Sequence, residues 1–482
     1  MSDILKGFEP VGLWHYFDQI RQIPRESGNE TAVVRYLIEF ARNNRLDYQS
    51  DEVGNVIIRK PASPGNEGKP GVVLQAHVDM VCEKNSDKAF DFATDPIQLR
   101  VDGDWLLAQD TTLGADNGIG VAAAMYVLTE PNLVHGPIEA LFTVDEERGL
   151  TGANNLKPGI LKGSYLINLD SEDEGVFTVG CAGGRDSTLY VPISWITRSN
   201  PALTIKVGGL KGGHSGVDIN MGKGNSIKLM ARLLQRFCSS WSLCLADIKG
   251  GSKRNAIPRE AEAVIGYTGN AEQLIHEMNL YFEQMKSEFC ESEPDMKLQI
   301  SQGVMPGQFL RQEDTARLIN LLIALPHGVI AMSQTMKDKV ETSTNLATIS
   351  IEQNQVSIGE MSRSSNATGM DLVCGIVLAC AEPAKADIFQ SSGYPGWQPN
   401  LKSELLKTMI RLHSELFKKE PIVESIHAGL ETGIIGKQYP AMDMISIGPD
   451  IRFPHSPDEK VRIPSVNNFW ILLKQTLIEL AK

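Results

Sequence analysis

The sequence predicts an α/β protein with a mostly parallel sheet flanked by helices and an inserted α+β domain. Several short apolar runs are bounded by turn residues, as in buried parallel strands, and helical patterns lie between them. The middle of the chain instead alternates polar and apolar residues, which is typical of strands with one solvated face. With 482 residues, the chain is also too long for a single hydrophobic core.

The two outer parts of the chain carry the pattern of an open sheet. Apolar residues recur at helical spacing between residues 10 and 48, with a break at the turn 23–28. Strands and helices then alternate, which is the arrangement of a sheet covered by helices. The expected elements are strands at 53–59, 72–76, 138–144, 166–169, 421–426 and 442–447, and helices at 119–128 and 401–417.

The middle of the chain predicts the inserted domain. Two consecutive sets of strand, helix and strand suggest an internal duplication of a split βαβ unit. Because strands of the outer pattern return after this region, the first domain must be discontinuous. We therefore expect a first domain at 1–186 and 396–482, with the insert at 187–395. The expected strands of the insert are 203–207, 261–267, 298–301, 344–352 and 355–362, and its helices are 226–237, 271–289, 314–324 and 369–381.

Composition and charge exclude some classes of function. The formal net charge is −13 and no basic run offsets it, which argues against nucleic-acid binding. The N-terminus lacks a signal-peptide pattern, and no stretch approaches the about 20 apolar residues of a membrane-spanning helix. The seven cysteines form no CxxC pair, which favours reduced thiols and a cytoplasmic protein. The sequence leaves the oligomeric state open, a homodimer included.

Five segments predict a metal site, because each carries histidine or acidic residues at the end of an apolar run or in the loop after it. In an open α/β sheet, the carboxyl ends of the strands form the crevice where ligands bind. Two histidines and at least three carboxylates exceed the needs of one tetrahedral metal, so the set suits a two-metal hydrolase. The segments contain His77 and Asp79, Asp116, Asp145 to Glu147, Asp170, and His455.

Taken singly, each segment has a plainer interpretation. A His-x-Asp after a strand is more often a capped turn than a ligand. An Asp-Glu-Glu run is usually a solvated helix start with favourable placement in the helix dipole. Only the repetition of one chemistry in five places favours the metal site. Imidazole and carboxylate together suit zinc, with cobalt or manganese as substitutes.

These motifs resemble the metallopeptidase family M20. The match extends over essentially the whole chain, including the large insert, and is strongest with bacterial members that cleave Xaa-His dipeptides such as β-alanyl-histidine. The resemblance implies a zinc-peptidase-like catalytic domain with an inserted lid domain. The motifs that carry it are His77-Val-Asp79, Gly114-Ala-Asp116-Asn-Gly118, Asp145-Glu-Glu-Arg-Gly149, Asp170 and the stretch from Gly448 to Pro457.

The resemblance also implies a ligand set. Asp116 would bridge two zinc ions, and the peptide bond that follows it would be cis. His77 and Asp170 would complete one metal, and Glu147 and His455 would complete the other.

Two neighbouring carboxylates have other implied roles. Asp79 would fix the tautomer of His77 and raise its basicity. Glu146 would be the general base that takes a proton from a water bridging the two zincs and returns it to the leaving amine.

Four further residues are implied to contact the substrate. His214, in the glycine-rich turn 212–216, would donate to the oxyanion when the domains close or from a neighbouring subunit; the turn alone indicates only a surface loop. Arg363 would bind the C-terminal carboxylate of a dipeptide, with Asn255 assisting, although an exposed arginine is usually a solvated charge. Glu431 would face the substrate ammonium group, and a plain glycine turn there is the alternative.

The leading hypothesis is therefore a dizinc Xaa-His dipeptidase. A tripeptidase or an N-acyl amino acid deacylase uses the same chemistry, because metal ligands do not encode the substrate. A non-catalytic metal-binding module is the competing class, and loss of the base or of a ligand would favour it. The complete set in this chain argues for an enzyme.

Overall fold

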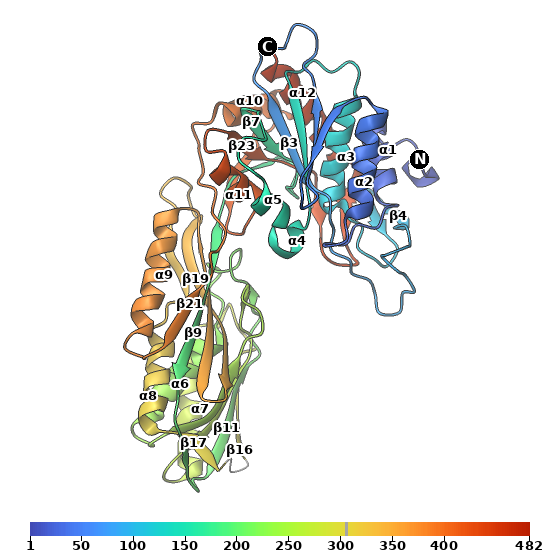
Figure 1. The fold of residues 1–482 in the computed structure, drawn as a ribbon. Coiled ribbons are helices and arrows are strands. Elements are labelled where there is room, and N and C mark those ends of the chain that lie inside the picture. The colour runs from blue at the N-terminus through green and yellow to red at the C-terminus, as the bar shows by residue number, and fades with distance from the viewer. Residues whose placement is uncertain (304–306) are drawn as a thin grey trace. The chain divides into compact units, whose positions relative to one another are not determined.

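The computed structural model describes residues 1–303 and 307–482 (Figure 1). By their internal contacts these residues divide into two compact units. Unit 1 contains Met1–Cys181, Trp397–Ser425 and Leu430–Lys482, and unit 2 contains Ala182–Gly396 and Ile426–Gly429. The predicted domain boundaries at 186 and 395 remain a proposal.

Unit 1 is built on an eight-stranded sheet, and its central strands are parallel. β3 lies between β6 and β7, and β23 continues the sheet beyond β7, all in parallel register. Antiparallel pairs flank this centre, namely β1 with β2, β2 with β6, and β23 with β8. Every residue of β3 and β6 is buried, which accounts for their continuous apolar runs. In order across the sheet, the strands are β1 (Asp47–Ser50), β2 (Val56–Lys60), β6 (Ile138–Thr143), β3 (Val72–His77), β7 (Tyr165–Asn168), β23 (Asp443–Ser446), β8 (Val176–Cys181) and β22 (Ile422–Ile426).

Helices cover this sheet, and one of them carries a predicted ligand. α3 packs on β3 and against α1 (Figure 1). α3 is apolar on nearly all sides because it is buried between these layers. A Cβ at Gly120 would meet the carbonyl oxygen of Leu169, so glycine lets α3 approach the end of β7. The helices of unit 1 are η1 (Asp3–Leu5), α1 (Val11–Ile20), α2 (Thr31–Asn43), α3 (Ala115–Thr129), α4 (Glu146–Gly149), α5 (Thr151–Asn155), α10 (Glu404–Phe417), α11 (Glu431–Gln438) and α12 (Ile463–Leu480).

A second, four-stranded sheet in unit 1 was not predicted. Its order is β24 (Ile451–Arg452), β25 (Lys460–Arg462), β5 (Trp105–Ala108) and β4 (Leu99–Asp102). These strands are too short and too mixed in polarity to stand out in the sequence. Pairing of β25 with β5 joins the C-terminal loops to the segment that leads into α3.

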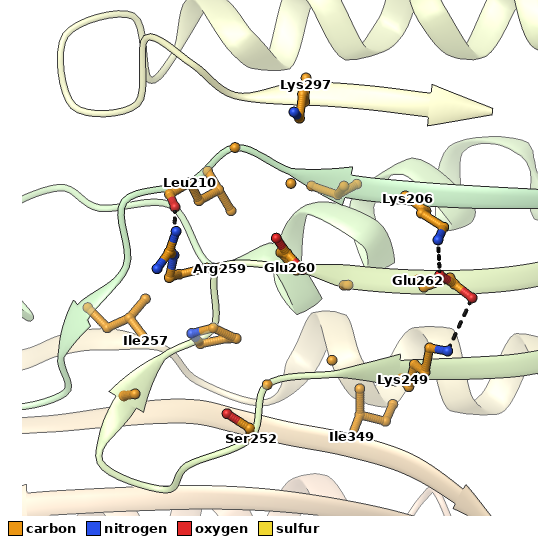
Figure 2. Close-up of a pocket in the computed structure, with 18 of the residues that line it drawn as sticks. Lys206, Leu210, Lys249, Ser252, Ile257, Arg259, Glu260, Glu262, Lys297 and Ile349 are labelled. Atoms are coloured by element: carbon orange, nitrogen blue, oxygen red, sulfur yellow. Dashed lines mark hydrogen bonds and ion pairs between the residues drawn. The ribbon is translucent and has the colours of Figure 1, made fainter. Parts of the chain in front are cut away.

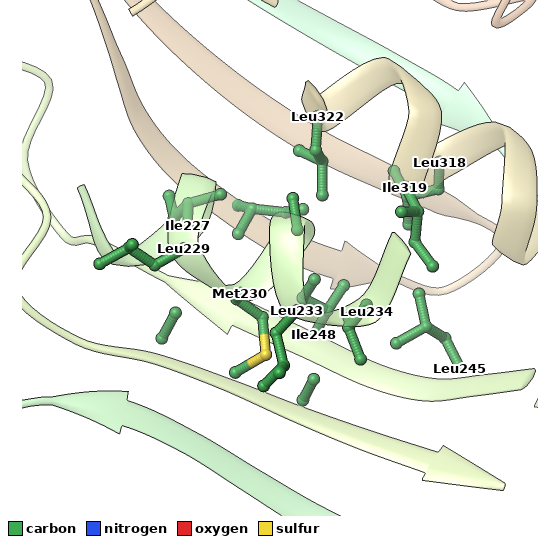
Figure 3. Close-up of a cluster of buried hydrophobic side chains, with 14 of the residues drawn as sticks. Ile227, Leu229, Met230, Leu233, Leu234, Leu245, Ile248, Leu318, Ile319 and Leu322 are labelled. Carbon is green, nitrogen blue, oxygen red and sulfur yellow. The ribbon is translucent and has the colours of Figure 1, made fainter. Parts of the chain in front are cut away.

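Unit 2 is a nine-stranded antiparallel sheet with its helices packed on a common core. Figure 3 shows side chains of α6, such as Met230 and Leu234, and of α8, such as Leu318 and Leu322, in one buried cluster. The alternation predicted for the insert is present, for example along β11, where exposed Lys206 lies between two buried residues. The strands in order across the sheet are β16 (Lys297–Gln302), β11 (Ala202–Gly208), β15 (Ala261–Gly266), β13 (Cys244–Gly250), β19 (Val340–Glu352), β20 (Gln355–Ser364), β9 (Gly183–Pro192) and β21 (Asp387–Gln390), with β18 (Gly328–Met332) also paired to β19.

The remaining elements of unit 2 are four helices and two small ladders. The helices are α6 (Ser226–Cys238), α7 (Ala271–Ser287), α8 (Gln312–Ala324) and α9 (Ala367–Ala381). The ladders pair β10 (Trp195–Thr197) with β17 (Gln308–Leu310) and β12 (Gly213–His214) with β14 (Ala256–Ile257). Among the described residues, no helix combines the length and the apolar character needed to cross a bilayer.

Candidate metal centre

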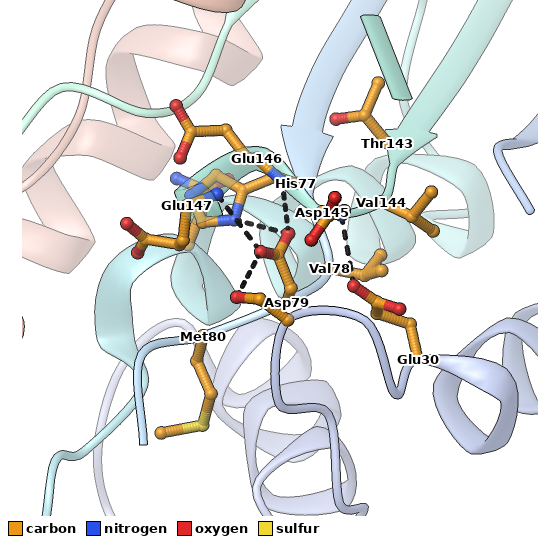
Figure 4. A network of polar contacts seen from close by, with 12 residues as sticks. Glu30, His77, Val78, Asp79, Met80, Thr143, Val144, Asp145, Glu146 and Glu147 are labelled. Carbon is orange, nitrogen blue, oxygen red and sulfur yellow. Dashed lines mark hydrogen bonds and ion pairs between the residues drawn. The ribbon is translucent and has the colours of Figure 1, made fainter. Parts of the chain in front are cut away.

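The carboxyl ends of β3 and β6 are tied together by Asp79. The backbone amides of Glu146 and Glu147 donate to its two oxygens at 3.0 and 3.2 Å, and the Ser27 hydroxyl donates at 2.7 Å (Figure 4). Burial raises the pKa of Asp79, but these hydrogen bonds and the nearby His77 imidazole outweigh it and hold the pKa below its usual range. Asp79 is therefore an anion whose oxygens face both the imidazole and the next loop.

Two imidazoles converge on one carboxylate. Nε2 of His77 lies 3.0 Å from Oδ1 of Asp116 and 3.3 Å from Oδ1 of Asp170. Nε2 of His455 lies 3.2 Å from Oδ2 of Asp116 and 2.9 Å from Oε1 of Glu147. Asp116 thus has one oxygen beside each imidazole, and each imidazole has a second carboxylate of its own. The Asp116–Asn117 peptide bond is cis, as the resemblance implied.

The five residues reach this place by different routes. His77 ends β3, Glu147 follows β6, and Asp170 follows β7, as expected for strand ends of one sheet. Asp116 differs, because it lies at the start of α3 and the strand before it belongs to the four-stranded sheet. His455 lies between the short strands β24 and β25 of that same small sheet. The expectation of strand ends in the main sheet is therefore wrong for Asp116, and His455 is reached through the small sheet.

The clustered oxygen and nitrogen atoms of this site are suited to binding cations. Buried Oε1 of Glu147 and Oδ1 of Asp170 each have an imidazole beside them, that of His455 at 2.9 Å and that of His77 at 3.3 Å. Hydrogen bonds with Asp116 and Glu147 raise the pKa of His455 to about 11, and burial raises the pKa of Asp170 to about 6. Divalent cations would balance the charge of these closely spaced carboxylates.

Two groups of donors each include three ligand atoms within 4.8 Å of one another: His77, Asp116 and Asp170 in one group, and Asp116, Glu147 and His455 in the other. Asp116 belongs to both groups. This arrangement has the composition of a site for two ions that share a carboxylate.

Glu146 lies beside these ligands and has unusual proton affinity. It also forms a three-residue group with His77 and Glu147 within the same 4.8 Å, so distance alone does not separate a base from a ligand. Burial raises the pKa of Glu146 well above its usual range, although His77 opposes the rise; the charges of Asp170 and Glu431 add to it. This carboxyl therefore binds a proton more tightly than an exposed glutamate does.

Glu431 lies inside unit 1 rather than on its surface. It begins α11, it is 1% exposed, and its Oε2 accepts hydrogen bonds from Gln75 at 2.5 Å and Thr143 at 2.7 Å. Its other oxygen is buried without a partner in the described residues. Burial raises the pKa of Glu431 to about 7.

His214 belongs to unit 2, and its hydrogen bonds select a tautomer. Nδ1 accepts from the backbone amides of Gly216 at 3.2 Å and Val217 at 3.1 Å. Burial and the nearby Arg363 guanidinium lower the pKa of the His214 imidazole. A neutral ring with an accepting Nδ1 carries its proton on Nε2, and in this tautomer Nη2 of Arg363, which lies 3.5 Å from Nε2 and can only donate, is not a hydrogen-bond partner of that nitrogen.

Arg363 is buried in unit 2 among groups that the sequence did not single out. It is 3% exposed, and it donates to the Tyr394 hydroxyl at 3.1 Å and the Ser215 hydroxyl at 3.4 Å. The usual interpretation of arginine as a solvated surface charge is therefore wrong here. His427 lies nearby, and burial followed by the charge of Arg363 lowers its pKa to about 3.

Asn255 contributes its backbone to the same unit. Its side chain is exposed, and its carbonyl accepts a hydrogen bond from the Ser215 amide at 2.8 Å. The pairing of β12 with β14 holds this segment next to the turn of His214. Sequence reasoning missed Tyr394 and singled out the segments of Ser215 and His427 without giving either residue a role of its own, because no spacing links them to Arg363. In unit 1 it also missed the buried ions Arg25 and Glu459.

A groove of about 1120 Å³ lies within unit 2, across β11, β15 and β13 (Figure 2). Glu262 at its floor pairs with Lys206 at 2.7 Å and Lys249 at 3.2 Å. None of the predicted site residues lines it. The groove is therefore separate from the residues considered above.

The sequence and the fold are similar to those of known peptidases. The model of the peptidase family M20/M25/M40 matches residues 73–478. A cytosol non-specific dipeptidase of Escherichia coli (strain K12) is 42% identical over 479 residues, which is 99% of each chain. The structure of an aminoacylhistidine dipeptidase from Vibrio alginolyticus has a TM-score of 0.92 and 43% identity, covering 99% of this chain and 98% of that one. An aminopeptidase PepT of Bacillus cereus, at 16% identity and a TM-score of 0.58, covers 98% of this chain and 100% of that one and shares the fold.

Proposed function

The chain belongs to the peptidase family M20/M25/M40, and from this premise we propose that it hydrolyses dipeptides, preferring Xaa-His dipeptides that include β-alanyl-histidine. It is a peptide-bond hydrolase, since two dipeptidases match it over nearly its whole length. The finer preference rests on the name of the Vibrio enzyme, whereas the Escherichia coli relative is called non-specific. That relative is also called cytosolic, which supports a cytosolic location.

The cofactor in this proposal is a pair of divalent cations, with zinc as the first candidate and cobalt or manganese as substitutes. His77 and Asp170 would hold one ion, Glu147 and His455 the other, and Asp116 both. The observation that carries the proposal is that the two oxygens of Asp116 face two different imidazoles, at 3.0 and 3.2 Å. When bound, the ions would lower the pKa of a shared water and polarise the scissile carbonyl.

The proton transfers would belong to Glu146. It would take the proton of the attacking water and deliver it to the leaving amine. Its raised pKa supports this role, because the carboxyl must keep the proton between the two transfers. Asp79 would orient His77, since its Oδ1 lies 3.4 Å from Nδ1 of that imidazole.

Substrate contacts would come mainly from unit 2. His214 would donate from Nε2 to the oxygen that becomes negative during attack, and its accepting Nδ1 supports that tautomer. Arg363 would bind the substrate carboxylate, with Asn255 assisting. Glu431 would compensate the charge of the substrate ammonium group from beneath the surface, since its side chain is 1% exposed.

The test is hydrolysis of a panel containing Ala-His, β-Ala-His, Gly-Leu, a tripeptide and an N-acetyl amino acid. We expect cleavage of the dipeptides, fastest for those ending in histidine, loss of all activity on chelation, and recovery with zinc. Cleavage of only the acylated substrate would establish a deacylase instead, and cleavage of only the tripeptide a tripeptidase. Absence of hydrolysis with metal bound would favour a non-catalytic metal-binding module.

A further inference from the structure

We propose that two buried ions, Arg25 and Glu459, are positioning residues that hold three ligand-bearing segments of the metal centre in register through their backbones. Arg25 is 2% exposed and Glu459 is 2% exposed, and neither contributes a donor atom to the ligand groups. The inference rests on the proposed function, because it assigns these residues to the same metal centre.

Arg25 joins the segment after β3 to the start of α3. Its Nη1 donates to the carbonyl oxygens of Val78 at 3.0 Å and Asp79 at 2.9 Å, and its Nη2 donates to that of Gly114 at 2.5 Å. His77 precedes the first of these carbonyls, and Asp116 follows the last by two residues. A planar guanidinium with several donors in fixed directions suits this task, since it sets the separation of the two segments.

Glu459 joins the start of α3 to the segment of His455. Its Oε2 accepts from the backbone amides of Leu113 at 2.7 Å and Gly114 at 2.9 Å. Its Oε1 accepts from those of Ala115 at 2.7 Å and Asp116 at 3.2 Å. One carboxylate thus binds four consecutive amides, those of the two residues before α3 and of the first two residues of that helix.

The two ions meet at the residue between them. Glu459 binds the amide of Gly114 while Arg25 binds its carbonyl, so Gly114 is held from both sides. Gly114 has a φ of +69°, and a Cβ there would meet Nη2 of Arg25 and Sδ of Met80. Only glycine fits this conformation and this approach without strain.

The segments that Arg25 and Glu459 join must keep fixed positions relative to one another. Asp116 must place one oxygen beside each imidazole, so an error in its backbone would misplace both. Of the five ligands, only Asp116 and His455 lie outside the strand ends of the main sheet. Arg25 and Glu459 position the segments of Asp116 and His455, whereas strands of the main sheet position the other three candidate ligands.

The test compares Glu459→Gln with Glu139→Gln. The first substitution would turn an NH₂ group toward two of the four amides. Glu139 is the control because it is a similarly buried glutamate at the opposite end of β6. It accepts hydrogen bonds from the backbone amides of Lys162 at 2.6 Å and Gly163 at 2.9 Å. We expect Glu459→Gln to weaken cobalt binding by about 10- to 100-fold, as measured by chelator competition, and to change the d–d absorption spectrum of bound cobalt. Glu139→Gln should lower Tm without either change.

Two further variants keep the test decisive if Glu459→Gln does not fold. Glu459→Asp should retain part of the cobalt affinity because a carboxylate remains, and Arg25→Lys should weaken binding because one ammonium cannot reproduce the fork. Folded variants at both positions with unchanged cobalt affinity and spectrum would overturn the inference. If the unmodified protein itself bound no cobalt, the proposed metal centre would fail first, so the two failures are distinguishable.

Discussion

At the scale of single residues, carboxylates in unit 1 act by dividing their two oxygens between different partners. Asp79 gives one oxygen to each of two consecutive amides, at 3.0 and 3.2 Å. Asp116 gives one to each of two imidazoles, at 3.0 and 3.2 Å. An amide or a shorter side chain does not offer two equivalent oxygens to two partners. We therefore expect substitutions of Asp79 or Asp116 to disturb two segments at once.

The separate roles of the two neighbouring glutamates are testable by comparing activity with metal content. Glu146→Ala should lower kcat by about 10²- to 10⁴-fold and keep both metals, because it removes a proton carrier. Glu147→Ala should lose metal, because it removes the oxygen that lies 2.9 Å from Nε2 of His455. Elemental analysis of both purified variants checks this. Full metal content in each would contradict the assignment of Glu147.

The role of Arg363 is testable with a substrate that lacks the free carboxylate. Arg363→Lys should raise KM for a dipeptide by about 10-fold or more and leave the corresponding C-terminal amide nearly unaffected, since a lysine cannot bind a carboxylate with two parallel bonds. The matched control is Arg254→Lys, because Arg254 instead donates to the carbonyl of Ser187 at 2.9 Å and the hydroxyl of Thr188 at 2.8 Å. Equal effects of Arg363→Lys on both substrates would reject the carboxylate contact.

At the scale of elements, unit 2 contains charged groups within its layers. Lys228 of α6 donates to carbonyls at the end of α8, those of Leu322 at 2.8 Å and Ile323 at 2.9 Å. This caps α8 with a positive charge.

Glu360 of β20 is fully buried, accepts a hydrogen bond from the Thr344 hydroxyl at 2.7 Å and has a second oxygen with no partner in the described residues.

Glu360 should make the stability of unit 2 depend on pH. Burial raises its pKa from 4.5 to about 8. Below pH 4.5 the folded and unfolded chains both carry the proton; above it the unfolded chain loses the proton first, so stability falls as pH rises to about 8. Glu360→Gln, which stays neutral, should therefore raise Tm by about 4 °C or more at high pH and by little in acid.

Thermal melts at about pH 5, near the lower end of this window, and at about pH 8.5, above it, check this prediction. Glu352→Gln is the control, because Glu352 is exposed at the end of the neighbouring strand β19 and should change Tm little at either pH. An equal shift for Glu360→Gln at both pH values would show that Glu360 does not hold its proton in the folded state.

At the scale of the whole molecule, the two units differ in what stabilises them. Unit 2 has a large apolar core shared by its helices and its antiparallel sheet. In unit 1, the closely spaced carboxylates of the candidate metal centre oppose folding until their charges are balanced. We therefore expect metal binding to stabilise the first unit.

Chelation should accordingly lower stability as well as activity. A ligand that binds only the folded state stabilises it by about 4 kcal/mol at a thousand times its Kd, so removal of tightly bound metal should lower Tm by several degrees. Calorimetry with and without chelator measures this, and Glu147→Ala serves as the control, since it should respond less. An unchanged Tm for the unmodified protein would mean that the site binds metal weakly or not at all.

Much of the site could be predicted because its chemistry follows local patterns. His77 ends a buried strand, and Glu147 and Asp170 lie shortly after two others, whose apolar runs are visible in the sequence; parallel strands bring such ends to one edge. The division of the five candidate ligands between two ions came from the resemblance to a family, since spacing alone does not assign them. The short strands that carry them to the site have no pattern that predicts them.

By itself, the sequence determined the α/β class, the central parallel strands and the set of polar residues available for chemistry, because burial and strand periodicity are local properties. Only the tertiary structure decided which oxygen of Asp116 faces which imidazole, and it alone revealed Arg25 and Glu459. Glu459 lies 343 residues from Asp116 and binds its backbone amide. Backbone groups are the same at every residue, so contacts of this kind leave no pattern in a sequence and appear only when the chain has folded.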